Sequence, residues 1–206
     1  VYGGIKHFAP GTMTRISVVP NGFDSHRFRK LPEIVKKDMA LTVAVVEQER
    51  SFYMKGFDKF IETARLLPSF DFLMVGISNE YLNRLERDLP KNLKTLPYTD
   101  TDELIRRYSE SKVFCLFSLS EGMPNTLNEA MLCECIPVGT QVTSIPEIIG
   151  ETGYIIHSQD LSEYVNKVEM ALRADPQLGK VARERITSRY NLESREKKIV
   201  SILSGS

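Results

Sequence analysis

The stretch VFCLFSLSEGMPNTLNEAM, residues 113–131, joins an apolar run to a segment of helical character through a loop of small and polar residues. The apolar run, residues 113–117, has the length and composition of a buried strand. Pro124 stands where helices often begin, and helix-like sequence follows it. Glu121 in the loop and Glu129 in the expected helix lie eight positions apart. This order predicts a strand, a loop and a helix of an α/β fold, with two carboxylates near the junction.

The same alternation continues along most of the chain. Further strand-like runs occupy residues 41–46, 71–76, 93–97, 136–140 and 154–157, and residues 57–67 show the helical spacing of apolar side chains. Runs that are apolar on both faces and separated by helices predict a parallel sheet covered on both sides. The fold class is therefore α/β: a Rossmann-like doubly wound sheet of about six parallel strands flanked by helices, with a helical C-terminal tail.

Local signals predict where several helices begin and how the chain enters the domain. The expected helix starts are marked by Asp100, Asp160, Asp175 and Asn191. The first residues lack this pattern and are expected to form a connector that ends in a strand at residues 15–20 and a turn at residues 21–22.

Composition excludes several classes of function. The 206 residues include 27 Lys and Arg and 27 Asp and Glu, with no polybasic block, so neither a nucleic-acid surface nor an electrostatic membrane anchor is indicated. No apolar run approaches the roughly 20 residues of a membrane-spanning helix. Cys115, Cys133 and Cys135 lack zinc-ligand spacing and are expected to be buried, reduced thiols, which favours the cytoplasm. The chain opens VYGGIKHF, without Met or a signal sequence, and is expected to be a fragment of a longer protein.

A ligand of such a sheet is expected at the carboxyl ends of its strands, where helix N-termini offer free N–H groups. The glycine fingerprint of dinucleotide-binding proteins and the phosphate-binding P-loop are both missing, which argues against an NAD-dependent dehydrogenase. Arg50 and Lys55 remain, five positions apart in one expected loop, and they would face the helix start at residues 122–126. Two cations and a helix N-terminus suit a diphosphate.

The two glutamates fit the same ligand. One carboxylate can accept two hydrogen bonds, which matches the neighbouring hydroxyls of a ribose or a hexose. Glu129 could then bind a ribose and Glu121 a sugar further out. The alternative is that Glu121 caps backbone N–H groups and Glu129 is a solvated helix residue.

Several motifs together resemble a known family. They are RSFYMKGFD (50–58), FLMVG (72–76), SLSEGMPNTLNEAM (118–131), IPVGT (136–140) and IPEII (145–149), preceded by VVPNGFD (18–24). In this order they resemble the C-terminal, donor-binding half of retaining GT-B glycosyltransferases of family 4, also called group 1 glycosyl transferases, over roughly residues 15–190. The resemblance implies one half of a two-domain GT-B fold. Its parts would be a remnant of the interdomain connection (1–14), a nucleotide-sugar-binding domain (15–190) and a C-terminal helix (191–206).

The resemblance also implies an activity and roles for matching residues. The parent enzyme would be a hexosyltransferase that moves a sugar from a UDP-, GDP- or ADP-sugar to an acceptor with retention. Arg50 and Lys55 would stabilise the leaving diphosphate, Glu121 would lie near the donor sugar and Glu129 on the ribose. The implied catalytic residues are Arg50, Lys55 and Glu121; the implied donor-binding residues are Gly122, Met123, Pro124, Asn125, Thr126, Leu127, Glu129, Pro97 and Tyr98. No metal and no other cofactor is implied.

Three departures from the family pattern limit what it implies. Glu49 stands where a glycine commonly precedes the arginine, and Thr143 and Ser144 replace a frequent Gly-Gly pair. All three would lie near the sugar end of the site, so the identity of the donor sugar stays open.

The length of the chain leaves room for one half of a GT-B enzyme. The missing partner is an N-terminal acceptor domain, so the chain is expected to bind a nucleotide sugar and to transfer little sugar by itself. Any membrane contact would come through that missing half, and the protein would be cytoplasmic, with peripheral attachment at the inner face of the membrane left open. A degenerate, non-catalytic module that binds a nucleotide or a partner remains the alternative.

Overall fold

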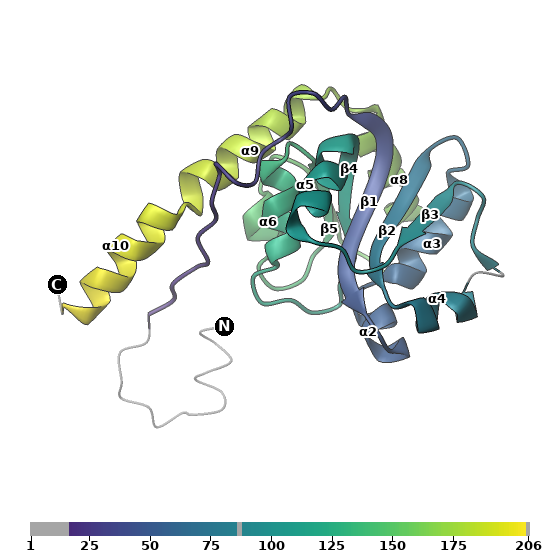
Figure 1. Ribbon diagram of the computed structural model, residues 1–206, viewed down its shortest axis with the longest axis horizontal. Helices are drawn as coiled ribbons and strands as arrows, with labels where there is room; N and C mark the ends of the chain where they lie inside the picture. Colours follow the sequence, from purple (N-terminus) through teal and green to yellow (C-terminus); the bar gives the residue numbers. More distant parts are fainter. Residues whose placement is uncertain (1–16, 86–87, 205–206) are drawn as a thin grey trace.

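The computed structural model describes residues 17–85 and 88–204, and it contains one sheet of six parallel strands (Figure 1). The strands are β1 (Lys37–Val46), β2 (Asp71–Ile77), β3 (Leu93–Leu96), β4 (Ser111–Leu116), β5 (Ile136–Thr140) and β6 (Tyr154–Ile156). Their order across the sheet is β3-β2-β1-β4-β5-β6, and each neighbouring pair is parallel. The doubly wound sheet that the sequence predicts is confirmed.

Helices cover both faces of this sheet (Figure 1). They are α2 (Glu49–Met54), α3 (Phe57–Leu66), α4 (Asn79–Leu85), α5 (Thr101–Glu110), α6 (Asn125–Leu132), α7 (Ile145–Ile149), α8 (Leu161–Arg173), α9 (Gln177–Arg189) and α10 (Leu192–Leu203). Side chains of α3 and α8 share a core with one face, and side chains of α5, α6, α7 and α9 share a core with the other. Alternate residues of β4 enter the two cores, Val113 and Cys115 the first, Phe114 and Leu116 the second.

Side-chain caps explain where several helices begin. Asp100, Asp160 and Asn191 accept hydrogen bonds from backbone N–H groups in the first turns of α5, α8 and α10. Asp175 does the same two residues before α9, where its carboxylate accepts from the N–H group of Gln177, the first residue of this helix. These helix starts are confirmed. In α10, which reaches beyond the sheet in Figure 1, no residue is buried.

Two expectations about local structure are wrong. The strand expected at residues 15–20 is not formed in its described part, residues 17–20. This segment meets no sheet edge; instead Phe23, just after it, makes a single bridge to Asn191 before α10. The expected loop that carries Arg50 and Lys55 contains a helix, α2, whose start is held by a hydrogen bond from Gln48 N–H to Ser51 Oγ. The expected connector remnant, residues 1–14, lies outside the described residues.

Other expectations concern cysteines, metals and membranes. The three cysteines are free and buried, as the sequence predicts. Among the described residues, no helix combines the length and apolarity needed to cross a membrane. The same part of the chain contains no group of three or more His, Cys, Asp or Glu side chains arranged to hold a metal ion.

Candidate functional site

The carboxyl ends of β1 and β4 lie side by side at the centre of the sheet. From β1 the chain continues outward to β2, and from β4 it continues in the opposite direction to β5. Such a reversal of strand order is where doubly wound folds bind ligands. Here α2 follows β1 and the loop at residues 117–124 follows β4, and Leu119 N–H donates to Met54 O at 2.9 Å. The two segments that carry the predicted catalytic residues therefore meet at this point.

A glycine makes this close approach possible. Gly56 lies between α2 and α3 with φ +69°, a conformation that favours glycine. A Cβ atom at this position would lie 2.2 Å from Phe117 O and 2.6 Å from Phe117 Cβ. Because the backbone can approach β4 so closely, the preceding residue, Lys55, reaches across to the loop after β4. The sequence motif contains Gly56, but its role becomes clear only from this long-range contact.

Lys55 and Glu121 form an ion pair in this position. Lys55 Nζ lies 2.7 Å from Glu121 Oε1, and the two side chains are 34% and 11% exposed. Ser118 Oγ, which belongs to a buried residue, donates to the same carboxylate oxygen at 2.6 Å. The other oxygen, Glu121 Oε2, makes no hydrogen bond with any described residue. Glu121 therefore does not cap backbone N–H groups, and it keeps one oxygen for a ligand.

Arg50 is placed differently from Lys55. It is the second residue of α2, it is exposed, and its side chain has no hydrogen bond or ion pair with another described residue. At about 100° per helical residue, five positions separate the directions of the two side chains by about 140°. The structure thus brings Lys55 to Glu121 but does not bring Arg50 to either of them.

Glu129 lies inside α6, in its second turn, and is partly buried. Tyr108 Oη, from the fully buried Tyr108 of α5, donates to Glu129 Oε2 at 3.3 Å. Burial raises the pKa of the Glu129 carboxyl group, and the hydrogen bond from Tyr108 lowers it in part. Burial and the neighbouring Glu129 also raise the pKa of Tyr108. Glu129 is therefore not a solvated surface residue, and Tyr108 is a partner that sequence reasoning missed.

The remaining predicted residues lie at the start of α6 and after β3. Gly122 and Asn125 are exposed, whereas the Leu127 side chain is buried in the core, so Leu127 can offer a ligand only its main chain. Pro97 and Tyr98 are exposed and follow the edge strand β3. Three strand spacings, about 14 Å, separate β3 from β4, so these two residues do not contact the Lys55 and Glu121 pair. Three donor-binding predictions remain between Gly122 and Leu127: Met123 and Thr126 are partly buried, and Pro124 is buried.

Thr143 and Ser144, which replace the frequent glycine pair, lie beside the loop at residues 117–124. Ser144 Oγ donates a hydrogen bond to Gly122 O, which ties the segment after β5 to the segment after β4. Thr143 adopts φ +44°, which is rare for a β-branched residue and strains the backbone. The segment after β5 is thus held against the same site.

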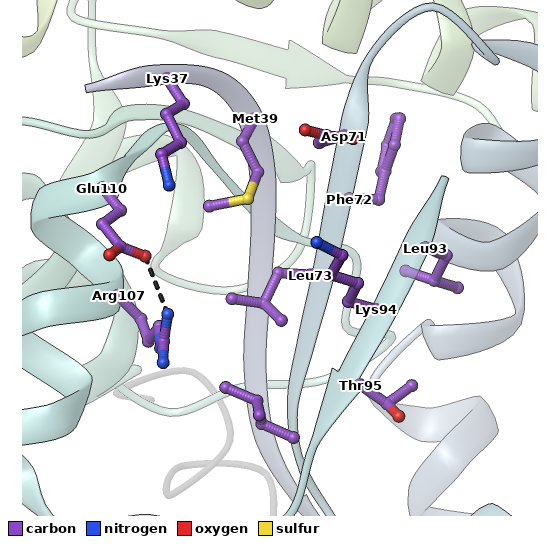
Figure 2. A pocket seen from close by; sticks show the side chains of 11 residues that line it. Lys37, Met39, Asp71, Phe72, Leu73, Leu93, Lys94, Thr95, Arg107 and Glu110 are labelled. Carbon is purple, nitrogen blue, oxygen red and sulfur yellow. Dashed lines mark hydrogen bonds and ion pairs between the residues drawn. The ribbon is translucent and has the colours of Figure 1, made fainter. Parts of the chain in front are cut away.

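A separate hollow of about 520 Å³ lies at the opposite end of the strands (Figure 2). It is lined by residues near the amino ends of β1, β2 and β3, including Lys37, Asp71 and Leu93, and by the Arg107 and Glu110 ion pair of α5. Ligands of doubly wound sheets bind at the carboxyl ends. The hollow in Figure 2 is therefore not the candidate site.

Comparisons with known proteins agree with the fold of this chain. The family described as glycosyl transferases group 1 matches residues 38–174. A phosphatidylinositol N-acetylglucosaminyltransferase subunit of Arabidopsis thaliana is 24% identical over 174 residues, which cover 79% of this chain and 37% of that protein. The chain thus spans little more than a third of the length of this relative.

Solved structures give the same result for the fold. Sucrose-phosphate synthase from Thermosynechococcus elongatus superposes with a TM-score of 0.82 at 18% identity, over 99% of this chain and 56% of that one. Anabaena Alr3699/HepE in complex with UDP-glucose superposes with a TM-score of 0.76 at 16% identity, over 92% and 57% of the two chains. In each case this chain matches a little over half of a longer protein.

Proposed function

The chain belongs to the glycosyl transferases group 1 family, and on this premise we propose that it is the donor-binding half of a retaining glycosyltransferase. It would bind a nucleotide diphosphate sugar, whose sugar passes to an acceptor held by another domain. The observation that carries this proposal is the Lys55, Glu121 and Ser118 cluster at the carboxyl ends of β1 and β4, beside the N-terminus of α6.

Cations and N–H groups at this edge would stabilise the leaving group. When the bond between the sugar and the diphosphate breaks, negative charge develops on a phosphate oxygen. Lys55 has three N–H donors and uses one for Glu121, so it can also donate to the diphosphate. Arg50 and the free N–H groups just before and at the start of α6, in residues 122–127 except Pro124, would add to this stabilisation. Their role is electrostatic, and no proton transfer by these groups is needed.

The two carboxylates would bind different hydroxyl groups. Glu121, with Oε1 occupied by Lys55 and Ser118, would orient the donor sugar through Oε2. Glu129 would accept hydrogen bonds from the ribose, and its hydrogen bond from Tyr108 would hold it in place. Pro97 and Tyr98, after β3, would seat the base. A nucleotide laid along the carboxyl edge of β3, β2, β1 and β4 would reach all of these residues.

The other half of the enzyme would supply the acceptor. We assign residues 15–190 to the nucleotide-sugar-binding domain and residues 191–206 to a C-terminal helix, and we expect the isolated chain to bind a donor but to transfer little sugar. Positioning of the acceptor and exclusion of water need the second domain. Free, buried cysteines support a reducing, cytoplasmic compartment.

A nucleotide panel tests the proposal. UDP, GDP and ADP are titrated against the chain by calorimetry and thermal shift, with UDP first because a solved neighbour binds UDP-glucose. A nucleotide at about 100 times its Kd should stabilise the fold by about 2.7 kcal/mol. Glu129→Ala should weaken this effect. Glu151→Ala, which removes an exposed carboxylate before β6 at the opposite end of the sheet, should leave it unchanged. Binding of none of the three nucleotides would overturn the proposal.

A second candidate is a nucleotide-binding module without transfer activity. The strained Thr143, next to the proposed sugar end, is the observation that favours it. Sugar transfer by the full-length protein that is lost on Lys55→Ala would exclude the module, and full-length protein that binds donor without transfer or hydrolysis would support it.

A further inference from the structure

Asn21 lies between the start of α6 and the C-terminal helix α10. Its segment, drawn in dark purple in Figure 1, passes the junction of α9 and α10. A Cβ atom on the next residue, Gly22, would lie 3.0 Å from Leu192 Cα and 3.1 Å from Arg195 Cβ. On the other side, Asn21 N–H donates to Met123 Sδ at 3.1 Å, just before α6. Asn21 therefore contacts both α10 and the segment that leads into the proposed diphosphate site.

Three side chains form a directed chain of hydrogen bonds through this residue. Arg195 Nη1 donates to Asn21 Oδ1 at 3.2 Å and to Pro20 O at 2.6 Å. Asn21 Nδ2 then donates to Asn125 Oδ1 at 3.1 Å, at the first residue of α6. A guanidinium group has no acceptor, so it fixes which end of the Asn21 amide faces Arg195. The other end must be a donor, and this in turn fixes the Asn125 amide with its oxygen toward Asn21.

The consequence is that Asn125 presents a donor to the site. Its Nδ2 group makes no hydrogen bond with any described residue, and the residue is exposed at the start of α6. We infer that Asn21 is a positioning residue that orients the Asn125 amide to donate to the diphosphate of the donor. The inference rests on the proposed function, which places the diphosphate at this helix start. Because each link donates in the same direction, from a cation toward an anion, the links also polarise one another.

Asn21→Asp tests the orientation with almost no change in shape. The new carboxylate still accepts from Arg195, but its second oxygen is an acceptor and would draw the Asn125 NH2 group toward itself. The Asn125 oxygen would then face the diphosphate. We expect the affinity for UDP to fall by about tenfold, the loss of one hydrogen bond to a charged group. The affinity for uridine, which has no phosphates, should stay unchanged, and the unfolding midpoint of the ligand-free chain should not fall.

A double-mutant cycle separates orientation from simple repulsion by the added charge. Repulsion would weaken UDP binding by the same factor in the wild-type and Asn125→Ala backgrounds, whereas loss of orientation acts only where Asn125 is present. Arg195→Lys keeps a donor to Asn21 and should retain UDP binding. Arg189→Ala is the matched control. Arg189, like Arg195 and Asn21, lines a hollow of about 190 Å³, but it makes no hydrogen bond with Asn21.

The outcomes distinguish this inference from the proposed function. If the wild-type chain binds none of UDP, GDP and ADP, the proposed function itself is overturned. If the wild-type chain binds UDP and Asn21→Asp binds it equally well, or loses the same factor in both backgrounds of the cycle, the orienting role of Asn21 is overturned. A loss that is confined to the wild-type background and to the phosphate-bearing ligand supports the role.

Discussion

Gly56→Ala should unfold the chain more easily and disturb the site at the same time. Alanine at φ +69° costs about 1–2 kcal/mol in backbone strain. Its Cβ would lie 2.2 Å from Phe117 O and 2.6 Å from Phe117 Cβ, well inside the roughly 3.5 Å of a normal contact. Relieving such an overlap typically costs about 1–3 kcal/mol. The total loss should therefore be about 2–5 kcal/mol, since Phe117 directly follows the central strand β4 and its backbone can shift little.

Urea denaturation followed by circular dichroism measures this loss, and thermal unfolding gives a second value. For a chain of about 200 residues, each kcal/mol lowers the melting temperature by about 2–4 °C. Gly122→Ala is a matched control because a Cβ atom there would meet no other atom within 4 Å. The control should remain within about 0.5 kcal/mol of wild type. Gly56→Ala should also move Lys55 away from Glu121 and weaken nucleotide binding. A stability change as small as that of the control would refute the role given to Gly56.

Three further substitutions test other parts of the structure. Burial raises the pKa of the Glu129 carboxyl group in the folded chain. As pH rises through that pKa the buried carboxyl group ionises, and the fold loses stability. Glu129→Gln should therefore raise the urea midpoint at pH 7 but not below about pH 4, while nucleotide binding weakens; a lower midpoint at pH 7 would contradict this. Lys55→Ala in the full-length protein should lower kcat by about 10²–10³, with a smaller effect in the Glu121→Gln background because the two residues are paired; independent effects would exclude the coupling. Asn92 Nδ2 donates to three carbonyl groups, one in the last turn of α3 and two just after this helix. Asn92→Ala should therefore destabilise the fold by about 1–3 kcal/mol in urea denaturation, whereas Lys91→Ala, at an exposed neighbour, should not.

The sheet could be predicted because its strands are buried on both faces and read as continuous apolar runs. The observed β5 has the bounds of the expected run at residues 136–140, and β6 differs by one residue. The start of β1 could not be predicted, since residues 37–40 include Lys37 and Asp38 at the amino edge of the sheet. Pairing with the neighbouring strands, as between Ala40 and Phe72, extends β1 there, and such pairing is not visible in local composition.

The helix α2 was missed because it is too short to show a period. It has six residues, and only Phe52 is buried. The Phe52 ring lies 5.3 Å from the Tyr81 ring and 6.0 Å from the Phe57 ring, between centroids. Contacts with α3 and α4 therefore stabilise this helix more than its own sequence does. The spacing of five between Arg50 and Lys55 thus predicts a shared loop, whereas in the structure the two side chains point in different directions.

The positioning residues of the site depend on contacts that no local pattern encodes. Glu121 and Glu129 could be identified from one motif, because both belong to the continuous segment that follows β4, Glu121 in its loop and Glu129 in α6. Tyr108 lies 21 positions from Glu129, and Asn21 lies 104 positions from Asn125. Nothing in the local sequence near Tyr108 distinguishes a core tyrosine from one that holds a carboxylate. Only the packing of α5 against α6 brings the two together.

The different surroundings of the two cations suggest that they act at different stages. Lys55 is paired with Glu121, so in the ligand-free chain much of its charge is already neutralised. Arg50 is exposed and has no partner among the described residues. Under the proposed function, an approaching diphosphate would be attracted chiefly by Arg50 and the N-terminus of α6, because these are the donors not yet engaged. Lys55 would become important once charge builds on the leaving oxygen, when its remaining N–H groups would gain more from the phosphate than from water. Substitutions of Arg50 should thus act mainly on affinity, and substitutions of Lys55 mainly on the rate of transfer.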